Sequence, residues 1–175
     1  VLVRKGALTL DAPAPIAAWR GAGDPRGAIT VDHLLRHTAG LALGSSLQAS
    51  LGSAFEPVNR MKFMESDMAA YAESIELATP PGSVFNYNDG NNIILSHLIR
   101  NATRGRPADV MRFAREELFA PLGMRNVTIE FDASGTPEGS SQMLASARDW
   151  ARFGELLAQR IEIGEAVLAN QGQRG

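Results

Sequence analysis

The stretch PPGSVFNYNDGNNIILSHLI, residues 80–99, carries the most information about the fold of this chain. Its Pro-Pro-Gly start predicts a rigid turn, and its apolar second half has the spacing of a buried helix. Between them, residues 86–89 form a polar cluster of sequence Asn-Tyr-Asn-Asp. Asn88 or Asp89 can cap the helix, and Asp89 also complements the helix dipole. A cap needs only one such side chain, so the presence of Tyr87 beside them requires a further explanation.

Outward from this stretch, the sequence pattern predicts a mostly helical chain with little strand. Helices are expected over residues 66–77, 90–101, 107–118 and 146–158, and between an N-cap at Thr30 and a stop at Gly40. Ser146 and Asp149 predict a capping box for the last of these helices. Residues 126–131 alternate as a short strand does. We expect one domain over residues 1–159, followed by a weakly patterned tail over residues 160–175.

The segment at residues 42–57 is rich in Ser, Gly and Ala and has no clean period. We expect it to be a surface excursion over a site. Four apolar residues in or beside it, Phe55, Met61, Phe63 and Met64, fit a pocket lining and core packing equally well. The segment therefore does not by itself indicate a substrate.

The composition excludes several classes of protein. Hydrophobic residues make up 45% and charged residues 21% of the chain, which are ordinary values for a globular domain. A net charge of -2 provides no excess of Lys and Arg for binding nucleic acid. No apolar run reaches the length needed to span a membrane. The absence of cysteine excludes disulfides, thiolate zinc sites and cysteine nucleophiles.

Two other candidate sites have weaker support in the sequence than the cluster at residues 86–89. His33 and His37 are four residues apart on a predicted helix, a spacing that can direct two imidazoles toward a metal ion. The zinc-protease pattern requires Glu directly after the first His, where this sequence has Leu34, and no third ligand is evident. We therefore expect no metal site, and a helical zinc protein is the weaker hypothesis. A glycine-rich loop at residues 18–27 lacks the strand-helix frame of a dinucleotide site.

Five stretches follow one another in the order and spacing of a known family. They are LTLDAPAP (8–15), ITVDHLLRHTAGL (29–41), the stretch at 80–99, LFAPLGM (118–124) and SSQMLASARDWARFGELL (140–157). Together they resemble the serine β-lactamase and penicillin-binding-protein-like family, and most closely its class C, esterase and 6-aminohexanoate-dimer hydrolase branch. The resemblance covers nearly all of residues 1–159, and five stretches in register are much stronger evidence than any one of them.

The resemblance implies an α+β fold. This chain would carry mainly the helical domain of a serine β-lactamase/DD-peptidase-like fold, with most of the antiparallel sheet missing. It also implies a serine hydrolase that cleaves an ester, amide or β-lactam bond of a small molecule through an acyl-enzyme, without a cofactor. In that family a Ser-x-x-Lys motif supplies the nucleophile and its proton acceptor, because a serine hydroxyl is a weak nucleophile until a base takes its proton. A Tyr-x-Asn motif supplies a proton-shuttling tyrosine, and a Lys- or His-Thr-Gly strand lines the site.

The family's Tyr-x-Asn motif matches Tyr87-Asn88-Asp89 in this sequence. The resemblance implies that Tyr87 is catalytic and that Asn88 and Asp89 bind substrate. The ordinary pKa of tyrosine is about 10, so Tyr87 can act as a base near neutral pH only if a nearby cation favours its phenolate. The third position is Asp89 instead of Asn. An ionised carboxylate only accepts hydrogen bonds, and its negative charge would oppose phenolate formation.

Two motifs of the family do not occur in this sequence. The chain has two lysines, Lys5 and Lys62, and the residues three positions before them are Leu2 and Asn59, so there is no Ser-x-x-Lys. There is no Lys-Thr-Gly or His-Thr-Gly either. In the order of the family, the nucleophile would precede the first residue and the strand would follow the last. We therefore expect an internal portion of a longer polypeptide that is inactive alone.

The alternative is a non-catalytic ligand- or peptidoglycan-binding relative that kept the fold and lost the nucleophile. A Ser-x-x-Lys motif upstream of Val1 would indicate the enzyme instead. The sequence leaves open the substrate, the oligomeric state and the compartment, which would be periplasmic, secreted or cytoplasmic.

Overall fold

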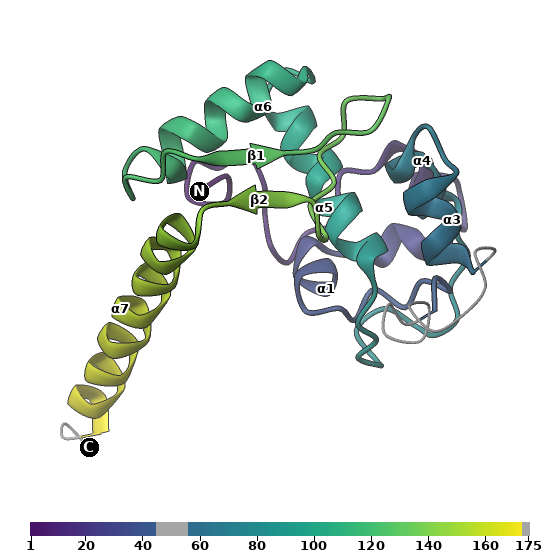
Figure 1. Cartoon of the computed structure of the whole chain (residues 1–175). Helices are drawn as coiled ribbons and strands as arrows, with labels where there is room; N and C mark the ends of the chain where they lie inside the picture. The colour runs from purple at the N-terminus through teal and green to yellow at the C-terminus, as the bar shows by residue number, and fades with distance from the viewer. Residues whose placement is uncertain (45–55, 173–175) are drawn as a thin grey trace. The chain divides into compact units, whose positions relative to one another are not determined.

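The computed structural model describes the backbone of residues 1–44 and 56–172 and the side chains of residues 1–44 and 56–159. Most of the predicted excursion at 42–57, including Phe55, lies outside the described residues. The chain divides into two compact units, whose segments can be followed by colour in Figure 1. The first unit consists of Val1–Met111 and Ile129–Gln142, and the second consists of Arg112–Thr128 and Met143–Gly175.

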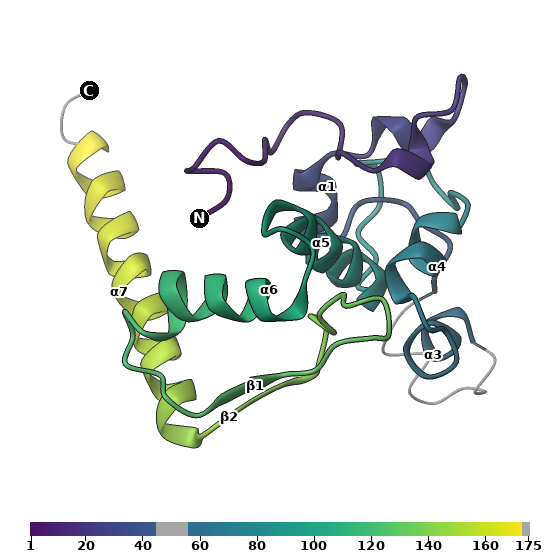
Figure 2. The ribbon, with the colours of Figure 1, turned by 90° about the horizontal axis from the view of Figure 1, so that it is seen from above.

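Helix α5 is the centre of the first unit. Within the described part of that unit it contacts three other helices, and two of them, α1 and α4, are drawn next to it in Figure 2. The four helices are α1 (Val31–Leu35), α3 (Pro57–Phe63), α4 (Met68–Ser74) and α5 (Asp89–Ala102). Two 3-10 turns, Ala17–Trp19 and Pro25–Ala28, precede α1. The helices pack on α5 because its apolar face, with Ile93, Ile94 and Leu98, is almost completely buried.

The apolar core lies around this face. Its members come from α1, α3, α4, α5 and the segments on either side of α1, and they include Ile16, Trp19, Ile29, Leu34, Leu41, Leu43, Met61, Met68 and Ala72. The Trp19 indole donates a 2.9 Å hydrogen bond to the carbonyl oxygen of Glu73 at the end of α4. Met61 is fully buried whereas Phe63 and Met64 are exposed, so the apolar residues of this region divide between the core and the surface.

Two strands and two helices complete the described part of the chain. Helix α6 (Pro107–Ala114) continues into a π-helical turn (Arg115–Phe119). The strands β1 (Val127–Ile129) and β2 (Met143–Ala145) form a two-stranded sheet, and helix α7 (Ala147–Gly172) follows β2. The strands are antiparallel, since Glu130 N–H bonds to the Gln142 carbonyl and Ser146 N–H bonds to the Asn126 carbonyl. The fold is therefore α+β and mostly helical.

Several boundaries confirm the sequence patterns. Helix α5 covers the predicted range 90–101 with one more residue at each end. The Thr30 side chain caps α1, with the His33 N–H donating to its hydroxyl over 3.1 Å. The predicted capping pair at the start of α7 is also present, because the Asp149 N–H donates to the Ser146 hydroxyl over 3.2 Å.

Other boundaries differ from the prediction. Helix α1 ends at Leu35, well before the predicted stop at Gly40, because the chain turns into a left-handed conformation at His37. Helix α4 is shorter than the predicted 66–77, because Ile75 is already extended. Helix α3 was not predicted at all, and α7 continues through most of the weakly patterned segment from residue 160.

Candidate functional site

The corner that presents Tyr87 is fixed by the cap of helix α5. Asn88 is extended, with φ -141° and ψ 150°, and its side-chain oxygen accepts a 3.2 Å hydrogen bond from the Asn91 N–H. Its amide nitrogen donates to the Asn86 carbonyl over 3.4 Å, and the residue is 2% exposed. Asn88 is therefore the cap of α5, and Asp89 is the first residue of the helix.

The segment before this cap is pinned to the chain that follows α1. The Asn86 N–H donates a 2.8 Å hydrogen bond to the His37 carbonyl, and its side-chain amide donates to the Gly44 carbonyl over 3.2 Å. Nearer the turn, the Gly82 N–H donates to the Thr38 carbonyl over 2.8 Å. Main-chain bonds therefore hold this segment before Tyr87, and the helix cap holds it after Tyr87.

Tyr87 itself is not buried in the core. Its side chain is 48% exposed, and the His37 ring lies against it with the ring centroids 4.7 Å apart and the planes inclined by 38°. His37 also meets Phe85, with centroids 6.2 Å apart in an edge-on arrangement. Tyr87 therefore combines a partly exposed ring and a contact with His37 on a backbone that is held on both sides by hydrogen bonds.

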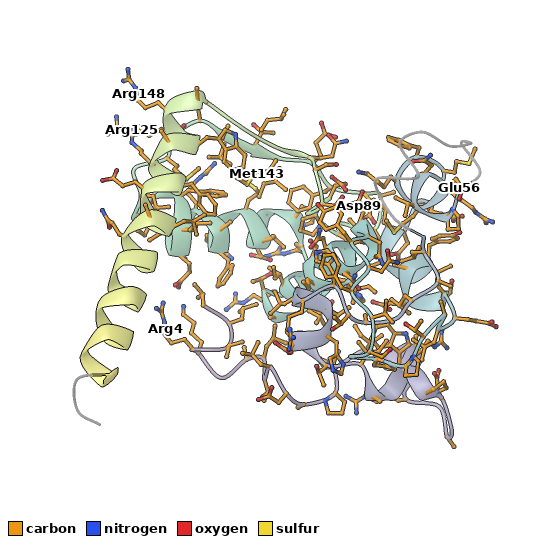
Figure 3. The ribbon with its side chains drawn as sticks, turned by 90° about the horizontal axis from the view of Figure 1, so that it is seen from below. Arg4, Glu56, Asp89, Arg125, Met143 and Arg148 are labelled. Atoms are coloured by element: carbon orange, nitrogen blue, oxygen red, sulfur yellow. The ribbon has the colours of Figure 1, made fainter. Side chains whose placement is uncertain are left out.

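The carboxylate of Asp89 is paired with a cation that sequence reasoning did not identify. Lys62, at the end of α3, donates a 3.0 Å hydrogen bond to Asp89, and the two side chains are 12% and 11% exposed. Asp89 lies among the side chains of the helical unit (Figure 3). Lys62 lies next to a segment without a hydrophobic period and 27 positions before Asp89, so no local sequence pattern links the two residues. The sequence draws attention to Lys62 only because lysine is scarce in this chain.

Lys62 also reaches the loop before β2. It donates a 2.8 Å hydrogen bond to the Ser141 hydroxyl and lies 3.7 Å from the Glu138 carboxylate. This serine-lysine contact does not make Ser141 a nucleophile, because an ammonium group paired with two carboxylates donates protons and accepts none. The Ser141 hydroxyl is also within 3.1 Å of the second oxygen of Glu138. We interpret the cluster as an electrostatic clamp between α3, α5 and this loop.

A cavity of ≈ 380 Å³ opens beside the clamp, within the first unit. Its lining includes Lys62, Phe63, Met68, Phe131 and Gln142. Phe63 was one of the residues considered as a pocket lining, whereas Met61 belongs to the core. Tyr87 is not among the residues that line this cavity.

The histidine pair does not form a metal site. His33 lies on α1 and accepts a 3.2 Å hydrogen bond from the Thr30 N–H, whereas His37 lies beyond the end of the helix. The predicted common helical face is therefore wrong, because α1 is too short to contain both residues. Within residues 1–44 and 56–159, no group of three or more His, Cys, Asp or Glu side chains could hold a metal ion.

The electrostatics around Tyr87 depend on His37 and Asp89. Burial lowers the pKa of His37 from its ordinary value, while a hydrogen bond to the Asn88 carbonyl and the charge of Asp89 act in the opposite direction. The His37 Nδ1 atom is 3.3 Å from the Asn91 amide nitrogen, which donates to it. Tyr87 therefore stands next to a neutral, hydrogen-bonded imidazole.

Comparison with models of known families identifies the family of this chain. A family model described as Beta-lactamase matches residues 1–174. The chain belongs to the β-lactamase family. The match extends through the segment after residue 159, which had not contributed to the resemblance. A comparison with curated proteins gives no significant match.

Solved structures share the fold of this β-lactamase family member. They include a candidate 6-aminohexanoate-dimer hydrolase from Bacillus anthracis, with a TM-score of 0.70 and 22% identity over 89% of this chain and 42% of that protein. The octameric penicillin-binding protein homologue from Pyrococcus abyssi has a TM-score of 0.63 and 22% identity over 91% and 41%. A D-stereospecific amidohydrolase from Streptomyces sp. has a TM-score of 0.58 and 24% identity over 87% and 54%. The chain spans about half the length of these proteins or less.

No helix in the described part of this β-lactamase family member has the length and apolarity needed to cross a lipid bilayer. The family and the fold agree with the resemblance that the sequence predicts. The roles of Tyr87, Asn88 and Asp89 stay predictions.

Proposed function

We propose that the complete protein is a serine hydrolase that cleaves an ester, amide or β-lactam bond through an acyl-enzyme, with Tyr87 transferring protons. One observation supports this proposal most directly. On a chain of the β-lactamase family, a half-exposed tyrosine stands at a corner that is fixed on both sides by main-chain and cap hydrogen bonds. A tyrosine that served only packing would be expected to turn its ring into the core.

The proposed chemistry needs a serine and a lysine that this sequence does not contain as a Ser-x-x-Lys motif. The complete polypeptide would supply them. The Tyr87 oxygen takes the proton of that serine while the serine oxygen attacks the carbonyl carbon of the substrate. As the tetrahedral intermediate collapses, the bond to the leaving amine or alcohol breaks, and Tyr87 returns the proton to it. Water then cleaves the acyl-enzyme by the same transfers in reverse.

The Lys62–Asp89 pair bears on the reactivity of Tyr87. An unpaired carboxylate two positions from Tyr87 would oppose the negative charge of a phenolate. Lys62, 3.0 Å from Asp89, offsets that charge. The departure from Asn at the third motif position is therefore compatible with the proposed role of Tyr87, because the clamp supplies a compensating cation.

The substrate-binding roles of Asn88 and Asp89 are narrower in this proposal than the motif implies. The Asn88 side chain is used in the helix cap and is 2% exposed, so its part is to hold the corner. Asp89 is 8% exposed and, as a carboxylate, could contact only an N–H or O–H donor of a substrate.

Activity-based labelling of the complete protein tests the proposal. A fluorophosphonate and a penicillin are each incubated with the protein, and the labelled peptide is identified by mass spectrometry. We expect a serine outside these 175 residues to be labelled, and more slowly in the Tyr87→Phe protein than in the wild type. Absence of any labelled serine, together with retained binding of the same compounds, would show the non-catalytic relative instead.

A further inference from the structure

His37 closes helix α1 in an unusual way. The Thr38 N–H donates to the His33 carbonyl over 2.8 Å, and the His37 N–H donates to the Leu34 carbonyl over 3.2 Å. These two bonds define a Schellman motif, in which the residue after the C-cap adopts the left-handed conformation and is usually glycine. Here that residue is His37, with φ 55°. A side chain at this position is disfavoured by the backbone, so its presence points to a role for the side chain.

The His37 imidazole is held by groups from α5. The Asn91 amide nitrogen lies 3.3 Å from Nδ1, and the Asn88 carbonyl forms a further hydrogen bond with the ring. Because an amide nitrogen only donates, Nδ1 accepts, and the proton of the neutral ring is on Nε2. Asn91 is fully buried, and its side-chain oxygen has no hydrogen-bond partner within the described residues. The amide is therefore turned toward His37 although its oxygen stays unsatisfied.

The imidazole also lies against Tyr87. The two ring centroids are 4.7 Å apart, and the His37 carbonyl accepts the hydrogen bond from Asn86, the residue before Tyr87. His37 thus touches the phenol ring with its side chain and fixes the neighbouring backbone with its carbonyl.

We propose that His37 is a positioning residue for Tyr87, and that the neutral, Asn91-bound imidazole is the form that holds the phenol ring in its working orientation. This inference rests on the proposed function of Tyr87. It assigns to the His37 ring a role that neither the helix end nor the family motif requires.

If His37 positions Tyr87, turnover should depend on the protonation of the His37 ring. Protonation adds a hydrogen to Nδ1, which then repels the Asn91 amide group; the amide can turn and offer its unsatisfied oxygen instead. The charged side chain that acts on His37 is Asp89 of α5, and Lys62 of α3 is paired with it. Burial lowers the pKa of His37, so we expect the ring to become protonated at a pH below the ordinary histidine pKa of about 6.5. Turnover should therefore fall on the acid side as His37 becomes protonated.

The test compares His37→Asn with wild type in the complete protein. Asparagine tolerates the left-handed backbone and keeps an acceptor for the Asn91 amide, but it has no ring and does not titrate. We expect kcat to fall about 10- to 100-fold with little change in KM, because a misoriented catalytic group slows the chemical step. The acid limb assigned to His37 should disappear, and the unfolding midpoint should stay close to wild type.

A measurement that does not depend on turnover tests the role of His37 separately from the proposed catalytic role of Tyr87. The His37 ring current shifts the Tyr87 ring protons in NMR spectra, and we expect this shift to be lost in His37→Asn. His33→Gln is the matched control, because Gln at the third helical position preserves the capping box with Thr30, and the described ring contact of Tyr87 is with His37 and not with His33. It should keep both the Tyr87 shift and the acid limb.

Wild-type kcat, an unchanged acid limb or an unchanged Tyr87 shift in His37→Asn would each overturn the inference. If Tyr87→Phe proved fully active, the proposed function would fail, while the Tyr87 shift would still decide whether His37 orients the ring. If His37→Asn failed to fold, His37→Gly, which suits the left-handed backbone better, would give the same comparison.

Discussion

The Lys62 ammonium group lies 3.0 Å from the Asp89 carboxylate and joins the end of α3 to the first turn of α5. Both side chains are nearly buried, at 12% and 11% exposure. The same ammonium group bonds to Ser141 and lies near Glu138. One lysine therefore compensates acidic groups from two separate segments beside the residue that we propose to be catalytic.

Removing this cation should destabilise the first unit. In Lys62→Met, the Asp89 and Glu138 carboxylates lose their shared partner while staying mostly buried. We expect a loss of about 2 kcal/mol in the free energy of unfolding, because breaking a buried pair leaves an uncompensated charge. Urea denaturation followed by circular dichroism measures this loss.

The double variant Lys62→Met/Asp89→Asn checks the cause. It removes one of the stranded charges, so it should recover part of the stability lost in Lys62→Met. If Lys62→Met were as stable as wild type, the pair would contribute nothing to folding.

Alanine substitutions at two glycines with the same backbone conformation should reduce the stability of the fold by different amounts. Gly40 has φ +82° and Gly23 has φ +81°, but a Cβ on Gly40 would lie 2.2 Å from the Thr79 carbonyl oxygen, whereas a Cβ on Gly23 meets nothing within 4 Å. Gly23→Ala should cost about 1 kcal/mol, the penalty of the left-handed backbone. Gly40→Ala should cost at least about 2 kcal/mol more, because the main chain must move. Equal thermal midpoints for the two variants would contradict the close packing of residues 40 and 79.

Asp149 should make the second unit sensitive to acid. Its side chain is bonded to the main chain of Arg125 and Asn126, to Ser146 and to Arg152. The hydrogen bond from the Asn126 N–H is the largest of the effects that lower the pKa of Asp149 from 3.8 to about 2.

A carboxyl group with a lowered pKa stabilises the folded state above its unfolded pKa, and this stabilisation is lost as the pH falls toward the folded pKa. Asp149→Asn should therefore be less stable than wild type at neutral pH, and the difference should shrink between about pH 4 and pH 2. Urea midpoints across this range measure it. A difference that stays constant with pH would show that the charge of Asp149 is not involved.

Local sequence signals predicted the helices well where a cap and a period coincide. Asn88 before an apolar run defines the start of α5, and Thr30 defines the start of α1. These elements are set by residues three or four positions apart, which a sequence displays directly. The end of α1 was missed, because a histidine instead of a glycine takes the left-handed position there.

The surroundings of Tyr87 could not be predicted in the same way. The contact of His37 with Tyr87 joins residues 50 positions apart, and the pairing of Lys62 with Asp89 depends on α3, a helix that the sequence pattern did not predict. Such contacts follow from how α1 and α3 pack on α5 and not from local propensity. The motif located the tyrosine, and the packing identified its neighbours.

The most direct test of the central claim replaces each of the two tyrosines of this chain in the complete protein. Tyr71 packs under Arg60, with the guanidinium 5.1 Å from its ring centroid, and serves as the control. Tyr87→Phe should keep the fold, as judged by circular dichroism, and lose about 100-fold or more in kcat on an ester or β-lactam that the wild type hydrolyses, whereas Tyr71→Phe should retain near wild-type turnover. Wild-type turnover in Tyr87→Phe would contradict the account.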